Sequence, residues 1–254
     1  MRRFTTLAGL CGLLIAFALP AGGGATIPGP NGLIVFRAVT GDGSSQVFTI
    51  APDGSGQRQL THLAGDAFGP HWSPESNRIV FEVDSPNNCA NVATMNRNGG
   101  GMRILPLANG DVCEASPTFS ADGHRIYYEG FDGANRDAIF SMKLNGTDRR
   151  LVSDCQGTGV TDPEVSPDGT MISFTCFSDE GQVLFDANID GSGLRQLMPY
   201  SAGVKADWSP DSQRIMFFTG PDGSDLTQMT GFSTFRPRNM AWGSALAHRP
   251  TGGN

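Results

Sequence analysis

A phrase of eleven residues occurs four times in this chain of 254 residues. The copies are HWSPESNRIVF at 71–81, TFSADGHRIYY at 118–128, EVSPDGTMISF at 164–174 and DWSPDSQRIMF at 207–217. Successive copies begin 47, 46 and 43 residues apart. A period of this length, made of short apolar strands and tight turns, is typical of propellers and other repeat arrays. The chain is therefore expected to fold as a series of similar units.

A second repeated signal is an Asp-Gly or Asn-Gly pair at the end of an alternating apolar run. The pairs are Asp53-Gly54, Asn98-Gly99, Asn145-Gly146 and Asp190-Gly191. Such pairs predict two-residue hairpin turns, because these residues accept the positive φ that such turns demand. Each unit is thus predicted to hold four antiparallel strands, which is one propeller blade.

The two signals together carry a family resemblance. P-x-W-S-P-D-G-x-x-I-x-F followed by D-G-S-G-x-x-x-L-T resembles the repeat of TolB-type bacterial β-propeller proteins, which are also called WD-repeat-like or PD-repeat proteins. The resemblance covers residues 31–243 and implies an all-β fold. Blades of this type serve binding proteins, lyases and peptidase propeller domains alike, so the resemblance leaves the function open.

The spacing of the signals predicts a β-propeller of about five blades. From Phe217 to Asp222 there are only five residues, where the other blades have 16 or 17 between the equivalent positions. The last blade is therefore expected to have three strands, with residues 226–230 paired against 214–219. The first blade begins directly at its second strand, at residues 31–36. A C-terminal strand around Trp242 is expected to complete the first blade and close the ring.

The N-terminal segment has the pattern of a secretory signal peptide. Arg2 and Arg3 precede an apolar stretch at residues 7–19 and small residues at 21–25, so residues 1–25 are expected to be cleaved. A lipoprotein anchor at Cys11 is the alternative, although Leu10 stands where a small residue is expected. The apolar stretch is too short for a membrane span. The mature chain is expected to be periplasmic or secreted, with a single propeller domain at 31–243 and a flexible tail at 244–254.

The charge balance argues against nucleic acid as a partner. The chain has 18 basic and 25 acidic residues, and two of the basic residues lie in the expected signal peptide. The mature chain would then carry 16 minus 25, or −9. Nucleic-acid binding needs a basic face that neutralises phosphates.

Four cysteines remain after residue 25: Cys89, Cys113, Cys155 and Cys176. An even number in an exported protein favours disulfides, with three possible connectivities. In the blade register all four lie on the face opposite the two turns, and we predict Cys89 with Cys113 and Cys155 with Cys176. Free thiols are the alternative. The sequence has no Cys-x-x-Cys pair and its histidines follow no ligand spacing, so no metal or other cofactor is expected.

The face opposite the turns is where we expect binding, because loops on a rigid scaffold usually carry it. The candidate binding residues are Phe68, His71, Glu114, Asp162, Tyr200 and Lys205. Packing against a neighbouring blade is the alternative for the two aromatic residues, an ordinary blade-edge side chain for His71, and solvated rim charge for the other three.

The sequence predicts no catalytic residues. A hydrolase would need a G-x-S-x-G nucleophile elbow, which the sequence lacks. We therefore expect a monomeric, non-catalytic scaffold that binds an envelope or extracellular protein or glycan. The alternative is a carbohydrate-active lyase or hydrolase with its site in the propeller funnel, for which His71 is the best candidate.

Overall fold

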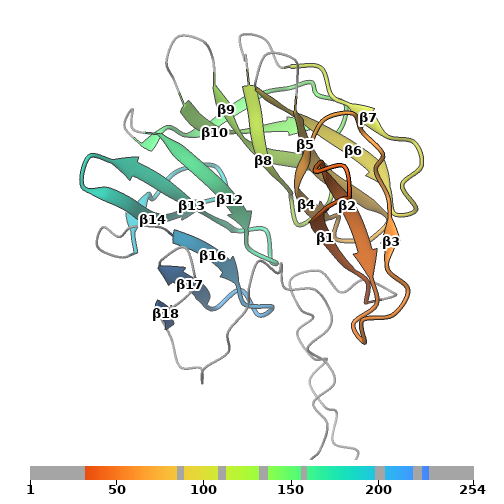
Figure 1. Ribbon diagram of the computed structural model, residues 1–254. Coiled ribbons are helices and arrows are strands. Elements are labelled where there is room, and N and C mark those ends of the chain that lie inside the picture. The colour runs from red at the N-terminus through yellow and green to blue at the C-terminus, as the bar shows by residue number, and fades with distance from the viewer. Residues whose placement is uncertain are drawn as a thin grey trace, which may run out of the picture.

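The computed structural model describes residues 32–84, 89–107, 113–131, 137–155, 159–197, 204–219 and 225–228. These residues form five antiparallel sheets that follow one another along the chain and fan out around a common centre (Figure 1). We call the sheets blades 1 to 5. The predicted all-β propeller of about five blades is confirmed.

The strands have the following bounds. Blade 1 consists of β1 (Ile34–Val39), β2 (Ser45–Ile50) and β3 (Arg58–Gln59). Blade 2 consists of β4 (Ala67–Trp72), β5 (Arg78–Asp84), β6 (Ala90–Asn96) and β7 (Arg103–Ile104). Blade 3 consists of β8 (Cys113–Phe119), β9 (Arg125–Phe131), β10 (Asp137–Lys143) and β11 (Arg150–Ser153). Blade 4 consists of β12 (Val160–Val165), β13 (Met171–Ser178), β14 (Gly181–Asn188) and β15 (Arg195–Gln196). Blade 5 consists of β16 (Val204–Trp208), β17 (Ile215–Thr219) and β18 (Asp225–Gln228).

Every blade is a simple meander, in which each strand pairs with its neighbours in sequence. Blades 1 and 5 have three strands within the described ranges. In blade 5, Phe218 pairs with Leu226, as the shortened spacing predicts. Within the described residues blade 1 begins at β1, which carries the Ile-x-Phe pattern of the second strands, as predicted. The expected closing strand around Trp242 lies outside the described residues.

The hydrophobic core lies between blades rather than inside one of them. Ile79 and Phe81 of β5 are buried against Val35 and Val47 of blade 1. Val80, which lies between them in sequence, is buried on the other side against blade 3. Successive residues of a strand point to opposite faces, so an apolar run buries both faces of the blade. The repeated Ile-x-aromatic pattern is therefore an inter-blade contact, and each such side chain stabilises the fold by roughly 1.5–3 kcal/mol.

Tryptophans on the inner strands connect neighbouring blades by hydrogen bonds. The indole N–H of Trp72, in blade 2, donates to the carbonyl oxygen of Leu33 in blade 1 at 3.0 Å. The indole N–H of Trp208, in blade 5, donates to the carbonyl oxygen of Glu164 in blade 4 at 3.0 Å. In both cases the tryptophan joins its blade to the preceding one.

The Asp-Gly turns differ from the prediction. In blade 1 the N–H of Gly54 donates to Ala51 O and the N–H of Ala51 donates to Ser55 O, both at 2.9 Å. Only Gly54 of this turn has a positive φ, of 83°. The loop therefore has three residues and ends in a left-handed glycine, so the predicted two-residue turn is wrong. Asp53 instead accepts hydrogen bonds from the N–H and hydroxyl of Ser55.

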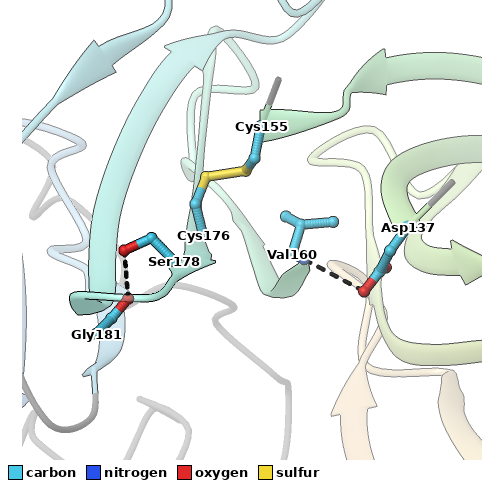
Figure 2. Close-up of a disulfide and its surroundings, with 6 residues drawn as sticks. All are labelled: Asp137, Cys155, Val160, Cys176, Ser178 and Gly181. Atoms are coloured by element: carbon cyan, nitrogen blue, oxygen red, sulfur yellow. Dashed lines mark hydrogen bonds between the residues drawn. A yellow bond between two sulfur atoms is a disulfide. The ribbon is translucent and has the colours of Figure 1, made fainter. Parts of the chain in front are cut away.

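Two disulfides join neighbouring blades, and their pairing confirms the prediction. Cys89, just before β6 of blade 2, is bonded to Cys113 at the start of β8 in blade 3, with 5.2 Å between the Cα atoms. Cys155, in the connection that leaves blade 3, is bonded to Cys176 of β13 in blade 4, with 5.9 Å between the Cα atoms (Figure 2). Disulfides of this kind indicate an oxidising compartment. None of the described residues forms a helix long and apolar enough to cross a membrane.

The second disulfide should contribute measurably to stability. The variant Cys155→Ala/Cys176→Ala opens a loop of 21 residues, so the free energy of unfolding should fall by about 3 kcal/mol in the chain-entropy account. Urea unfolding under oxidising conditions measures it. The wild-type protein treated with iodoacetamide but no reductant is the control. An unchanged midpoint would show that this bridge does not constrain the unfolded chain.

Candidate functional site

Three inner strands share a β-bulge close to where they begin. The strand register shifts between Phe68 and His71 in β4, and at the equivalent places in β8 and β12. The bulged residues, Gly69, Ser116 and Asp162, have φ values of 49°, 48° and 51°. A proline follows each of them. Bulges re-aim side chains and leave backbone groups free for other partners.

The bulges bring carboxylates of the second strands into contact with the inner strands. The N–H of Ser116 donates to Glu82 Oε2 of blade 2 at 3.3 Å. The hydroxyl of Ser116 donates to Glu129 Oε2 of its own blade at 3.4 Å. It also lies 3.3 Å from the hydroxyl oxygen of Thr161 in blade 4. Side chains of three successive blades therefore meet here. We call Glu82, Ser116, Glu129, Thr161 and Asp162 the bulge cluster.

The electrostatics of the bulge cluster favour a protonated carboxyl group. Burial raises the pKa of Glu129 to about 7, from a usual value of 4.5. A hydrogen bond from Thr161 opposes this shift, and the negative charges of Asp137, Asp162 and Glu82 add to it. Burial also raises the pKa of nearby Asp137, whose carboxylate accepts the N–H of Val160 at 3.4 Å (Figure 2). The cluster thus combines hydrogen-bond acceptors with a group that titrates near neutral pH.

Two of the sequence-predicted residues contact side chains of other blades. Phe68 is half-buried, and the guanidinium carbon of Arg37 in blade 1 lies 5.2 Å from its ring centroid. Its observed contact is thus with a neighbouring blade. His71 Nε2 lies 3.7 Å from Glu164 Oε1. This pair joins the inner strands of blades 2 and 4.

The remaining predicted residues have different environments. Glu114 is fully buried, so its interpretation as a solvated rim charge is wrong. The reason is its position in β8, opposite Gly130 of β9, inside the sheet rather than in the loop. Asp162 is half-buried and belongs to the bulge cluster. The backbone of Lys205 pairs with Phe218. Tyr200 lies outside the described residues.

Sequence reasoning missed Glu82 and Glu129, because it looked for functional residues in loops. Both lie inside second strands, directly after the buried aromatic residues Phe81 and Tyr128. A charged residue within an otherwise apolar strand was the available signal, since buried charges need a partner. No group of three or more potential metal ligands occurs in the part of the chain that the structure describes.

The family model described as the TolB beta propeller domain matches residues 23–210. The chain belongs to the TolB propeller family. Its match spans the two disulfides, the bulge cluster and all of blades 1 to 4. The family assignment therefore covers the candidate site and not only the repeated turns.

Individual relatives of this TolB-type propeller are distant. The Tol-Pal system protein TolB of Alcanivorax borkumensis is 25% identical over 135 residues, which is 52% of this chain and 31% of that protein. The crystal structure of TolB from Acinetobacter baumannii has a TM-score of 0.63 at 16% identity, covering 77% of this chain and 49% of that one. An oligogalacturonate lyase solved in complex with manganese has a TM-score of 0.52 at 13% identity, covering 69% and 50%. The chain thus spans half or less of each of these proteins, and the two structural likenesses concern the fold alone.

The raised pKa of Glu129 should make this TolB-type propeller less stable as the pH rises. Because the folded carboxyl group holds its proton up to about pH 7 and the unfolded one only to about 4.5, the folded state binds more protons between these values. Stability should therefore fall from pH 4.5 to 7, by about 3 kcal/mol. Glu129→Gln should remove this slope and be the more stable protein at pH 8.

Thermal melts of both proteins at pH 5, 6, 7 and 8 test the expectation. Glu180→Gln, in the exposed turn between β13 and β14, is the matched control and should keep the wild-type slope. Parallel melting curves for wild type and Glu129→Gln across this range would contradict it.

Proposed function

We propose that this protein is an exported, non-catalytic scaffold that binds a partner protein on the face that carries the bulge cluster. The observation that supports the proposal is that contacts between blades hold the side chains of this face in place. Side chains of blades 2, 3 and 4 are fixed against one another there by inter-blade hydrogen bonds. Two disulfides tie the same blades together. A preorganised surface of this kind loses little conformational entropy on binding.

The chemistry of the face suits a protein partner with donor groups. Glu82, Asp162 and the hydroxyl of Thr161 offer acceptor oxygens, and Phe68 adds an aromatic ring. Carboxylates that accept hydrogen bonds from a cationic side chain form the stronger class of such bonds. Family membership supports the proposal, since the curated relative is named as a protein of the Tol-Pal system.

A periplasmic or secreted location is part of the proposal. The signal-peptide pattern of residues 1–25 and the two disulfides support it. Fractionation of cells that express the full chain would test it. Recovery of unprocessed protein from the cytoplasm, with free thiols, would count against export.

The binding function can be tested by affinity capture from a cell-envelope extract. The immobilised propeller should retain a partner protein, and Phe68→Ala or Asp162→Asn should reduce its recovery at least fivefold. Asp53→Asn, in a turn on the opposite face, is the matched control and should retain the partner fully. Equal recovery by all variants would place the interaction elsewhere.

The same preparation separates this function from the enzymatic alternative. Purified protein is incubated with oligogalacturonate and other acidic polysaccharides, with and without added Mn²⁺, and product is followed by absorbance at the wavelength of unsaturated uronides. The proposal expects no turnover. Turnover that disappears in His71→Ala would overturn it in favour of a lyase.

A further inference from the structure

The two disulfides lie in different environments. Cys155 and Cys176 are 8% and 5% exposed, and belong to an apolar cluster with Val160, Ile172 and Phe174. Figure 2 shows the bridge between the connection that leaves blade 3 and strand β13. Cys89 and Cys113 are both half-buried instead, and do not belong to the apolar clusters. The cysteine residues of the two bridges therefore differ in their exposure to solvent.

Access decides whether a disulfide reacts in the folded protein. Exchange requires a thiolate to reach one sulfur atom, and it leaves a negative charge on the other. A buried apolar site excludes the attacking thiolate and disfavours the charge that would form there. Neither obstacle applies to the same degree at a half-buried bridge.

We propose that Cys89–Cys113 is a thiol-exchange site in the folded protein, whereas Cys155–Cys176 is a permanent structural bridge. The reactant is a thiol. Its thiolate attacks Sγ of one of the two cysteines, a new S–S bond forms, and the other cysteine leaves with the bonding electron pair and takes a proton from water. A second thiolate then attacks the mixed disulfide, which yields the oxidised thiol pair and a dithiol at Cys89 and Cys113. Two thiols have been oxidised and one disulfide reduced.

Reduction of this bridge would act on the contact between blades 2 and 3. The bridge ties the start of β6 in blade 2 to the start of β8 in blade 3. Three residues after Cys113, Ser116 connects the same two blades through its hydrogen bond to Glu82. Opening the bridge removes the disulfide cross-link between blades 2 and 3 and leaves the chain connection, this hydrogen bond and the apolar contacts of Val80 and Val92 with blade 3.

Graded reduction of the native protein tests the inference. Full-length mature protein is treated with dithiothreitol at pH 8, at concentrations on the order of 0.1 to 10 mM, which are chosen to reduce accessible disulfides. Free thiols are then trapped with N-ethylmaleimide and located by peptide mass spectrometry. Labelling of Cys89 and Cys113 should reach half-maximum at a dithiothreitol concentration at least tenfold lower than labelling of Cys155 and Cys176. In guanidinium chloride the difference should disappear, because burial is lost.

Two variants keep the test independent of unfolding. Cys89→Ala/Cys113→Ala retains the buried bridge, which should resist dithiothreitol as it does in the wild type. Cys155→Ala/Cys176→Ala retains the half-buried bridge, which should remain reducible. Circular dichroism at each dithiothreitol concentration checks that the fold persists. Equal reduction of both bridges in folded protein, or earlier reduction of Cys155–Cys176, would overturn the inference.

Discussion

Replacing Gly191 by alanine should lower the free energy of unfolding by about 3–4 kcal/mol. The residue has a φ of 86°, which disfavours any side chain by roughly 1–2 kcal/mol. An added Cβ would also lie 1.8 Å from the carbonyl oxygen of Val152 in the preceding blade. The turn or the neighbouring backbone must shift, and overpacking of this kind costs about 1–3 kcal/mol. The melting temperature should fall by roughly 10 °C.

Gly54 provides a matched control, because it occupies the same position of the same type of turn in blade 1. Its φ is 83°, but no atom lies within 4 Å of an added Cβ. Gly54→Ala should therefore cost only the backbone term, about 1–2 kcal/mol. Differential scanning calorimetry of the two variants isolates the inter-blade contact. Equal losses would show that the turn of blade 4 can move away from Val152 at no cost.

Deletion of residues 237–254 should destabilise the propeller by about 4 kcal/mol. We propose that Trp242 supplies the missing innermost strand of blade 1. The indoles of Trp72 and Trp208 each donate to the backbone of the preceding blade, and Trp242 is the third tryptophan of the chain. Loss of one large aromatic contact costs about 3–5 kcal/mol.

A shorter deletion distinguishes the effect of the proposed closing strand from that of the tail that follows it. Removal of residues 244–254 alone should leave the melting temperature within about 1 °C of the wild type, while removal of 237–254 should lower it by more than 8 °C. Trp242→Phe keeps an aromatic side chain at this position but loses the indole N–H donor, so it should lower the free energy of unfolding by about 1 kcal/mol. A 237–254 deletion that melts like the wild type would show that the ring closes by another segment.

The blade architecture could be predicted from the sequence because the repeat constrains both faces of each blade. The Ile-x-aromatic pattern of Ile79 and Phe81 recurs at the equivalent positions of the other blades, because every blade packs on the next in the same way. The cysteine pairing followed from this register. The turn geometry did not, because Asp-Gly is compatible with loops of two or three residues and only the backbone hydrogen bonds distinguish them.

The candidate site was predicted only in part, for a physical reason. Loop composition indicated a candidate face and included Phe68 and Asp162. It could not indicate Glu82 and Glu129, whose contacts depend on bulges in other strands that bring Ser116 and Thr161 beside them. Glu114 was misplaced for the same reason, since the position at which a loop becomes a strand decides whether its carboxylate is buried.

The positions of the disulfides divide the ring unequally. The bridges span the joints between blades 2 and 3 and between blades 3 and 4. The three central blades are therefore cross-linked by disulfides, whereas within the described residues no disulfide joins blades 1 and 5 to them, and the contacts there are packing and hydrogen bonds. Thermal opening should begin at the two outer blades, and a protease applied below the main melting transition should leave the central three as the longest-lived fragment.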